Sequence, residues 1–267
     1  MSQSSSLFLE TTTPLKIVVF DLDETLGYFS EFGMFCTAIE TFRGEKLTQS
    51  EFNDTLDLYP EFIRPNIIKI LTFLKEKKQS KQCNHIMIYT NNQGPKEWAV
   101  SIKSYFENKM GCVIFDKIIA AFKVNGKQIE FCRTTHNKTH NDFIKCTKVP
   151  ENSQICFLDD VYHPEMKNNN VYYINIKPYV HDLPYKTLID RYAITHGIEP
   201  NSSFESKCEA HLKRYNHVVV EKNPAEYEID KILTKQILHH IRIFFNMPKT
   251  RHNRTKPNSL TKTKRIK

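Results

Sequence analysis

The chain has 267 residues, of which 40% are hydrophobic and 25% are charged. This balance is typical of one globular domain with a large core plus terminal segments. No segment approaches the ~20 consecutive apolar residues that a membrane-spanning helix needs. The composition therefore excludes a helical membrane protein, and we expect no membrane interaction.

The formal net charge of +8 is concentrated at the C-terminal end. From Arg251 onward the chain has seven basic residues and no acidic residue: Arg251, Arg254, Lys256, Lys262, Lys264, Arg265 and Lys267. We expect residues 248–267 to form a disordered basic tail, because a short polar segment cannot bury enough apolar surface to fold alone. Its charge favours contact with nucleic acid or an acidic protein. A role in solubility alone explains it equally well.

The cysteines indicate a reducing environment. Seven are scattered through the chain without a Cys-x-x-Cys pair, and none has an obvious partner: Cys36, Cys83, Cys112, Cys132, Cys146, Cys156 and Cys208. An intracellular location, in the cytoplasm or the nucleus, follows from this usage. Residues 1–14 are rich in Ser and Thr and lack a basic region, so we expect a disordered N-terminal segment rather than a signal peptide.

Three apolar runs each end on residues suited to phosphate chemistry. Residues 16–20 precede Asp-Leu-Asp-Glu-Thr, residues 85–89 precede Thr-Asn-Asn, and residues 154–158 precede Asp-Asp. If these runs are neighbouring parallel strands, their carboxyl ends meet in one crevice, where open α/β sheets bind ligands. The crevice would hold carboxylates, a hydroxyl and amides together.

Helical patterns connect the apolar runs. The expected helices cover residues 64–77, 98–106 and 142–147, and further strand regions cover residues 113–115, 118–122 and 171–176. Strands that alternate with helices predict an α/β fold with a Rossmann-like parallel sheet and right-handed crossover helices. We expect this domain to span residues 15–182.

Helices dominate after residue 183. Three helical patterns cover residues 186–195, 203–215 and 225–245, and the last carries an apolar stripe of Ile229, Ile232, Leu233, Ile237 and Ile241. The pattern predicts a helical extension over residues 183–247 that packs on the sheet domain.

Asp21 and Asp23 form the most specific candidate site. Residues two apart in an extended segment point the same way, so both carboxylates can project from the end of a buried strand. Two neighbouring carboxylates repel each other unless they share a proton or a cation. A divalent ion with oxygen ligands, most simply Mg2+, meets that need and also neutralises a phosphate. A surface turn or helix cap is the alternative, which the apolar residues upstream disfavour.

The chain resembles the haloacid dehalogenase superfamily around these residues. The segment Ile17-Val-Val-Phe-Asp21-Leu-Asp23-Glu-Thr25-Leu26 resembles motif I of this superfamily. Its sequence Asp-Leu-Asp-Glu-Thr-Leu is similar to that of the small CTD-phosphatase branch, the FCP/SCP or NIF-like proteins. Other elements follow in order: Arg64-Pro65, with Asn66 in place of the branch's Gly, Tyr89-Thr90 for motif II, and Leu158-Asp159-Asp160 for motif IV.

The resemblance covers roughly residues 16–177 and is nearest to the CTD-phosphatase-like proteins of iridoviruses and related large DNA viruses. It implies the haloacid dehalogenase fold with a small cap or none. It also implies that Asp21 is the nucleophile that forms an aspartyl-phosphate. Asp23 is then the general acid and afterwards the base. Thr25 braces the loop, and Thr90 with Asn91 holds the phosphate oxygens.

The same resemblance implies a magnesium site. Asp160 and Asp21 supply carboxylates, Asp23 supplies its backbone carbonyl, and Asp159 accepts hydrogen bonds around them. Waters complete the octahedral oxygen set that Mg2+ prefers. An Asp-Asp helix cap is the alternative for the last two residues of the motif.

The family also uses a lysine that binds the phosphate and offsets the charge of the nucleophile. Lys138 precedes Thr139-His-Asn-Asp142, a plausible helix start, so its ammonium can reach the crevice. Lys145 is closer to Asp159 in the sequence but falls within the helix. We favour Lys138, and either lysine is also compatible with a simple surface charge.

The stretch around Lys138 contains a second constellation. The donors of Cys132, His136, His140 and Cys146 are of the types that bind tetrahedral zinc. Their spacing is not a common one. The simpler interpretation is a histidine pair beside two unrelated cysteines.

The substrate stays open between several classes. The segment between Thr25 and Arg64 is too short for a full lid domain, so we expect an open site for phosphoserine or phosphothreonine in a protein such as the RNA polymerase II C-terminal domain. The run Thr90-Asn-Asn-Gln-Gly94 resembles that of polynucleotide 3'-phosphatases and small-molecule phosphatases, although Glu24 departs from their pattern. An inactive docking module with a nucleic-acid-binding tail is the remaining alternative. The sequence does not indicate an oligomeric state.

Overall fold

The apolar runs that were predicted as strands lie side by side in one parallel sheet. The computed structural model describes residues 13–199, 203–248 and 263–266. Strand β1 (Lys16–Phe20) pairs with β2 (His85–Tyr89) on one side and with β6 (Gln154–Asp159) on the other. The prediction of three neighbouring parallel strands is therefore confirmed.

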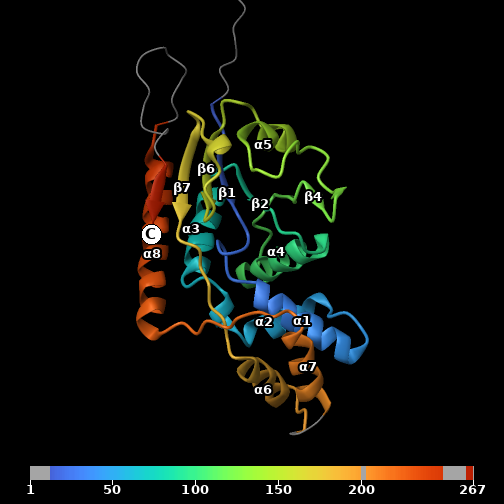
Figure 1. Cartoon of the computed structure of the whole chain (residues 1–267). Helices are drawn as coiled ribbons and strands as arrows, with labels where there is room; N and C mark the ends of the chain where they lie inside the picture. Colours follow the sequence, from blue (N-terminus) through green and yellow to red (C-terminus); the bar gives the residue numbers. More distant parts are fainter. Residues whose placement is uncertain (1–12, 200–202, 249–262, 267) are drawn as a thin grey trace, which may run out of the picture.

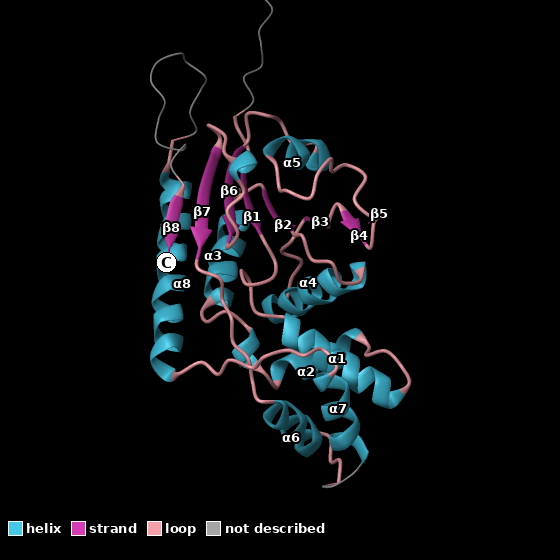
Figure 2. Cartoon of the chain, in the orientation of Figure 1, coloured by secondary structure: helices cyan, strands magenta, loops and turns pink. Residues whose placement is uncertain are grey.

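The sheet continues outward from these strands in both directions. Strand β3 (Lys117–Ile119) follows β2, while β7 (Val171–Ile176) and β8 (Lys264–Ile266) follow β6. The order is β3-β2-β1-β6-β7-β8, and all six strands are parallel (Figure 2). In chain order this is the 3-2-1-4-5-6 arrangement of a Rossmann-like sheet, whose connections change direction between β1 and β6. A ligand crevice is expected at the carboxyl ends of those two strands.

Alternate residues of the strands face two separate cores. Val18 and Phe20 of β1 join the larger core, together with α3 (Ile67–Gln79), α4 (Lys96–Met110) and α8 (Pro224–Asn246). Ile17 and Val19 face the opposite side, where α5 (His140–Thr147) and the 3-10 helix η2 (Pro164–Met166) cover the sheet. The alternation follows from the two-residue period of a strand that is buried on both faces.

Helix α8 is fixed at its carboxyl end by the first residue of β1. The Lys16 ammonium donates hydrogen bonds to the backbone oxygens of Phe244, Phe245 and Met247, at 2.8 to 2.9 Å. A cation is favourable there because the last carbonyls of a helix carry partial negative charge. The buried stripe of α8 includes three of the predicted residues, Leu233, Ile237 and Ile241, whereas Ile229 and Ile232 are exposed.

Four helices form a separate layer beyond the carboxyl edge of the sheet (Figure 1). They are α1 (Ser30–Arg43), α2 (Gln49–Asp57), α6 (Tyr185–Thr195) and α7 (Ser203–Lys213), and we call them the helical layer. A short 3-10 helix, η1 (Pro60–Phe62), leads from α2 back toward α3. Edge-to-face ring contacts join Phe35 to Tyr192 at 5.8 Å and Phe42 to Phe204 at 5.1 Å. Helix α7 packs on α1, which lies within the predicted domain of residues 15–182, and α6 packs on α7. These two helices of the C-terminal extension therefore meet that domain at α1.

Two further expectations differ from the structure. Lys264–Ile266 was included in the disordered basic tail, but these residues form the edge strand β8 through backbone pairing with β7. The predicted strand region over residues 113–122 contains only β3, and a small antiparallel pair, β4 (Lys123–Val124) with β5 (Lys127–Gln128), follows it. The predictions for residues 1–12 and for most of the tail lie outside the described residues. None of the described helices has the length and apolarity that a membrane crossing requires.

Candidate active site

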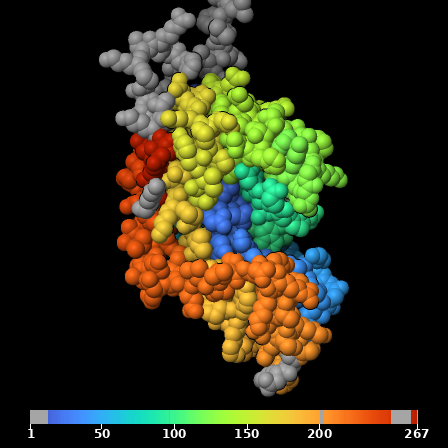
Figure 3. Space-filling view, in the orientation of Figure 1, coloured from blue at the N-terminus to red at the C-terminus, as the bar shows by residue number. Residues whose placement is uncertain are grey.

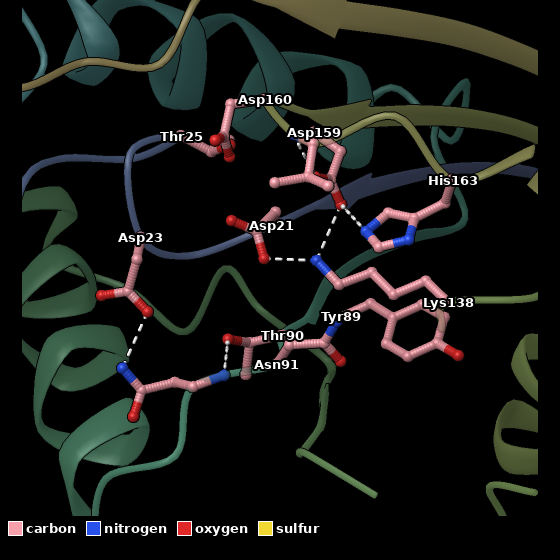
Figure 4. A network of polar contacts seen from close by, with 12 residues as sticks. Asp21, Asp23, Thr25, Tyr89, Thr90, Asn91, Lys138, Asp159, Asp160 and His163 are labelled. Carbon is pink, nitrogen blue, oxygen red and sulfur yellow. Dashed lines mark hydrogen bonds and ion pairs between the residues drawn. The ribbon is translucent and has the colours of Figure 1, made fainter. Parts of the chain in front are cut away.

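The carboxyl ends of β1 and β6 bring three carboxylates together. The backbone N–H of Asp21 donates to Leu158 O at 2.9 Å, which fixes the end of β1 beside the end of β6. One carboxylate oxygen from each of Asp21, Asp159 and Asp160 lies within 4.8 Å of the others. Figure 4 shows all three around a common space. The predicted convergence of these residues at one sheet edge is thus present.

Lys138 lies between two of these carboxylates (Figure 4). Its ammonium donates to Asp159 Oδ2 at 2.7 Å and also to Asp21 Oδ1. Burial on its own lowers the pKa of Lys138, but Asp159 and Asp21 more than offset this effect and raise the pKa above its ordinary value. The lysine therefore stays charged beside the proposed nucleophile. The competing candidate, Lys145, is exposed on α5 and lines a different hollow.

Asp23 follows Asp21 in the loop after β1, and one of its two carboxylate oxygens has a hydrogen-bond partner. Asn92 Nδ2 donates to Asp23 Oδ2 at 2.7 Å. The buried Asp23 Oδ1 has no hydrogen-bond partner among the described residues. Burial first, and the nearby Asp21 second, raise the pKa of Asp23 to about 6. A carboxyl group in this state can hold a proton and release it near neutral pH.

Thr25 acts on Asp160 rather than on the space in front of the carboxylates. Its hydroxyl is buried and donates to Asp160 Oδ1 at 3.4 Å. The Asn175 side chain donates to the backbone oxygens of Asp159 and Asp160, at 3.1 and 2.9 Å. Thr25 does not line the cavity that the carboxylates share. The structure therefore places Thr25 as a residue that orients Asp160, not as a direct substrate contact.

Residues that follow β2 form another part of the lining of the cavity that the carboxylates share. Thr90 and Asn91 both line the cavity, as predicted. The Thr90 hydroxyl accepts a hydrogen bond from the backbone N–H of Asn92 at 3.0 Å, which closes the turn after the strand. Asn91 Oδ1 accepts from Arg133 at 2.8 Å, which leaves its amide NH2 group for other partners. Asn92, which reaches Asp23, was not identified from the sequence.

Arg133 is a second residue that the sequence did not reveal. It is buried, and its guanidinium donates to the backbone oxygens of Thr90, Ala120 and His136, at 2.8 to 3.1 Å. The guanidinium carbon Cζ of Arg133 lies over the ring of Tyr89, 4.8 Å from the ring centre. Arg133 thus joins the end of β2 to the loop that carries Lys138. No periodic pattern marks an isolated arginine in a loop, so its role could not be predicted from the sequence.

His163 also lines this cavity and lies beside Asp159. Its Nε2 lies 3.6 Å from Asp159 Oδ2, and the residue is almost fully buried. Burial, together with the positive charges of Lys138 and Arg133, lowers the pKa of His163 to about 4. The imidazole is therefore neutral at ordinary pH and adds no positive charge to the site.

Arg64 stabilises the loop after β1 through hydrogen bonds to backbone oxygens. Its guanidinium donates to Thr25 O at 2.6 Å, to Lys177 O at 2.9 Å and to Glu24 O. The next two residues turn into α3, and Asn66 has a φ of +63°, in the left-handed region where Gly and Asn are the favoured residues. Asn66 can therefore stand where the related motif has Gly.

A cavity of about 210 Å³ opens in front of these side chains. In Figure 3 the blue surface that follows β1 lies between the green and teal surface after β2 and the yellow surface of β6 and β7. The donor set is all oxygen, and within the described chain Asp160 has no ion pair. Three close carboxylates therefore face a single ammonium, an excess of negative charge that a hard divalent cation such as Mg2+ fits. Both oxygens of Asp159 already accept hydrogen bonds, Oδ2 from Lys138 and Oδ1 from the backbone N–H of Val161. Asp21, which accepts from Lys138 through Oδ1 alone, and Asp160 are therefore the carboxylates that remain to hold the cation.

The zinc constellation is not assembled. Cys132 and Cys146 are joined in a disulfide. His136 instead contacts the ring of Phe122, with the ring centres 5.4 Å apart. Among the described residues, no metal-competent group brings together the four donors considered for zinc. The expectation that no cysteine has a partner is also wrong for this pair, which the sequence could not show because the two positions meet only through the path of the loop.

Comparisons with known proteins add nothing to this geometry. The chain matches no protein-family model, and no curated protein matches its sequence.

Proposed function

We propose that the chain is a Mg2+-dependent phosphoric monoester hydrolase of the haloacid dehalogenase type, which works through an aspartyl-phosphate. The observation that carries this proposal is the position of Lys138 between Asp21 and Asp159, with Asp160 beside them. A carboxylate can attack a phosphoryl group only if the surrounding charges reduce their mutual repulsion. An inactive docking module has no need of this buried arrangement.

In the first half-reaction Asp21 attacks phosphorus, and the bond from phosphorus to the leaving oxygen breaks. Asp23, in its protonated form, gives its proton to that oxygen, so the product leaves as an alcohol. The amide groups of Asn91 and the ammonium of Lys138 bind the phosphoryl oxygens. Asn92 holds the Asp23 carboxyl in place through the hydrogen bond to Oδ2.

In the second half-reaction a water molecule attacks the phosphorus of the aspartyl-phosphate. Asp23, now ionised, accepts a proton from this water as the bond from Asp21 to phosphorus breaks. Inorganic phosphate and the free Asp21 carboxylate are the products, and Asp23 is protonated again. A bound Mg2+, held by Asp21, the backbone carbonyl of Asp23 and Asp160, would supply electrostatic stabilisation of the phosphoryl group.

The proposed substrate is phosphoserine or phosphothreonine in a protein, of which the RNA polymerase II C-terminal domain is an example from the related branch. The cavity shares the lining residues Asp23 and Asn92 with a larger hollow, so it suits a phosphate on a long chain. A polynucleotide 3'-phosphate and a small phosphate ester are the competing substrates. The intracellular location, in the cytoplasm or nucleus of a host cell, and the binding of nucleic acid or an acidic protein by the basic tail belong to the same proposal.

The test is Mg2+-dependent release of phosphate from p-nitrophenyl phosphate, phosphoserine peptides and 3'-phosphorylated DNA. Wild type should turn over at least one of these, and Asp21→Asn should abolish turnover, because the amide cannot form an acyl-phosphate. Asp54→Asn is the matched control, since Asp54 is exposed on α2 and does not line the cavity. Equal activity of Asp21→Asn and wild type would refute the mechanism.

A further inference from the structure

A second and larger hollow adjoins the cavity of the candidate site. It has a volume of about 670 Å³ and lies between α1, the start of α2 and the amino end of α4. We call it the helical groove. Asp23 and Asn92 line both the helical groove and the site cavity. Their hydrogen-bonded pair therefore stands at the boundary between the two.

The walls of the helical groove are mainly apolar and well supported. Trp98 of α4 contributes a large, partly exposed ring, which packs edge-on against Phe52 with the ring centres 5.5 Å apart. Gly33 of α1 lets this ring approach, because a Cβ added there would lie 3.3 Å from the indole. Met34 and Leu47 line the groove beside it and are half-buried. This is a preformed apolar surface rather than a gap between polar loops.

The charge of the groove distinguishes between the classes of substrate. Asp23, Glu40 and Glu97 line it. Lys46 is the basic residue of its described lining, and its ammonium already pairs with Glu40 at 2.6 Å. A polynucleotide carries a phosphate charge at every residue, so a phosphate beside the reacting one would meet Glu97, which forms no ion pair among the described residues. A peptide need not carry charge beside its phosphorylated residue.

We propose that the helical groove is a peptide subsite, which binds a large apolar side chain of the substrate next to the phosphorylated serine or threonine. This inference rests on the proposed function. The phosphate lies at Asp21, the peptide passes the Asp23–Asn92 pair, and the apolar side chain lies against Trp98. Removal of that side chain from water supplies binding free energy, and the carboxylate of Glu97 disfavours an anionic neighbour.

A peptide series tests this directly with the full chain. Phosphoserine peptides carry Leu, Phe or Ser at each flanking position in turn, and kcat/KM is measured in Mg2+. At one position or more, Leu or Phe should raise kcat/KM by about 10-fold or more over Ser, which is the value of burying one such side chain. The Met34→Glu variant should remove this preference and leave turnover of p-nitrophenyl phosphate near that of wild type. Leu47→Glu is the second variant, in case Met34→Glu does not fold.

Val100→Glu is the matched control, since Val100 is exposed on α4 and does not line the groove. It should keep both the peptide preference and the turnover of p-nitrophenyl phosphate. A flat peptide series with active enzyme would overturn the subsite and spare the proposed function. Absence of turnover on every substrate would instead overturn the proposed function.

Binding can be measured even without turnover. The sequence contains a single tryptophan, Trp98, so intrinsic fluorescence reports occupancy of the groove. With the Asp21→Asn protein, a Leu-containing phosphopeptide should give a saturable change, and its Ser-containing counterpart should bind about 10-fold more weakly. Equal affinities of the two peptides would refute the proposal. So would tighter binding of 3'-phosphorylated DNA with a larger fluorescence change.

Discussion

The side-chain amide of Asn92 donates a hydrogen bond to Asp23 Oδ2 at 2.7 Å, while its carbonyl oxygen accepts one from the backbone of Gly94, also at 2.7 Å. Asn92 therefore ties the carboxyl of the proposed general acid to the turn after β2. A residue in the turn after β2 thus controls the position of a residue in the loop after β1. Activity should be sensitive to Asn92 although it forms no bond with the substrate in the proposed mechanism.

The first prediction concerns this pair. Asn92→Ala should lower kcat by about 10- to 100-fold, because a misplaced acid transfers its proton less efficiently. Asn92→Asp should lower it further, since a second carboxylate would face Asp23. The measurement is turnover of p-nitrophenyl phosphate under saturating conditions. Gln93→Ala is the control, because Gln93 is exposed beside Asn92 and does not line the cavity. A kcat of Asn92→Ala equal to that of wild type would show that Asp23 needs no such support.

The second prediction separates the two candidate lysines. Lys138→Met should abolish activity and lower the free energy of unfolding by about 3 kcal/mol or more, because Asp21 and Asp159 are then buried without their cation. Lys145→Met should change neither quantity, since Lys145 is exposed. Urea denaturation and turnover of p-nitrophenyl phosphate measure the two effects. The opposite ranking of the two variants would move the phosphate-binding role to Lys145.

A double variant tests the cause of the lost stability. Lys138→Met combined with Asp159→Asn removes one of the two uncompensated charges, so part of the lost stability should return. Activity should not return, because the ammonium is still missing. Additive losses in the double variant would show that the destabilisation does not come from charge.

The strands and the first carboxylates could be read from the sequence because each depends on a local pattern. The run before Asp21 is apolar throughout, as a strand buried on both faces must be, and β1, β2, β6 and β7 all appeared where such runs lie. The carboxylates at their ends then converge through sheet topology alone. Parallel strands place their carboxyl ends on one edge, so Asp21 and Asp160 meet although 139 positions separate their numbers.

Other features carry no local signal. Strand β8 is held by backbone pairing with β7 at a sheet edge, and Lys264-Arg265-Ile266 shows no apolar run. The apolar stripe of a helix shows that one face is buried but does not identify the element that covers it, so the sequence did not show that α7 packs on α1 and α6 on α7. The roles of Asn92 and Arg133 arise from the course of two loops. A single polar residue in a loop has no period from which its contacts could be inferred.

The third prediction concerns the disulfide between Cys132 and Cys146. These residues are 14 positions apart, and the loop that they close carries Arg133 and Lys138. Reduction should lower the free energy of unfolding by about 3 kcal/mol, the value for a loop of this length. It should also lower kcat, because the loop that positions Lys138 gains freedom. Thermal unfolding and turnover, with and without a phosphine reductant, measure both effects.

Two variants control for unrelated effects of the reductant. A double variant, Cys132→Ser with Cys146→Ser, should resemble the reduced wild type and should not respond to the reductant. Cys112→Ser should respond as wild type does, because Cys112 is a free cysteine. If the reductant shifts the double variant as much as wild type, the disulfide is not the cause.

The last prediction concerns Glu31, which lies buried on α1 away from the candidate site. Its Oε2 accepts a hydrogen bond from the backbone of Leu183 at 2.8 Å, and its Oε1 has no hydrogen-bond partner among the described residues. Burial first, and the nearby Asp182 second among the raising effects, raise the pKa of Glu31 from 4.5 to about 8. The folded chain therefore retains a proton on Glu31 at pH values at which the unfolded chain has lost it.

The sign of the pH dependence follows from this difference. Between about pH 4.5 and about pH 8 the folded state binds more protons than the unfolded state, so this carboxyl makes the free energy of unfolding fall as pH rises, by at most about 1.4 kcal/mol per pH unit. Glu31→Gln cannot titrate and still accepts the bond from Leu183, so its stability should fall less steeply over that range. Urea denaturation at several pH values measures the slopes. Glu45→Gln, at an exposed position just after α1, should keep the slope of wild type. Parallel pH profiles for Glu31→Gln and wild type would show that Glu31 is ionised in the folded chain.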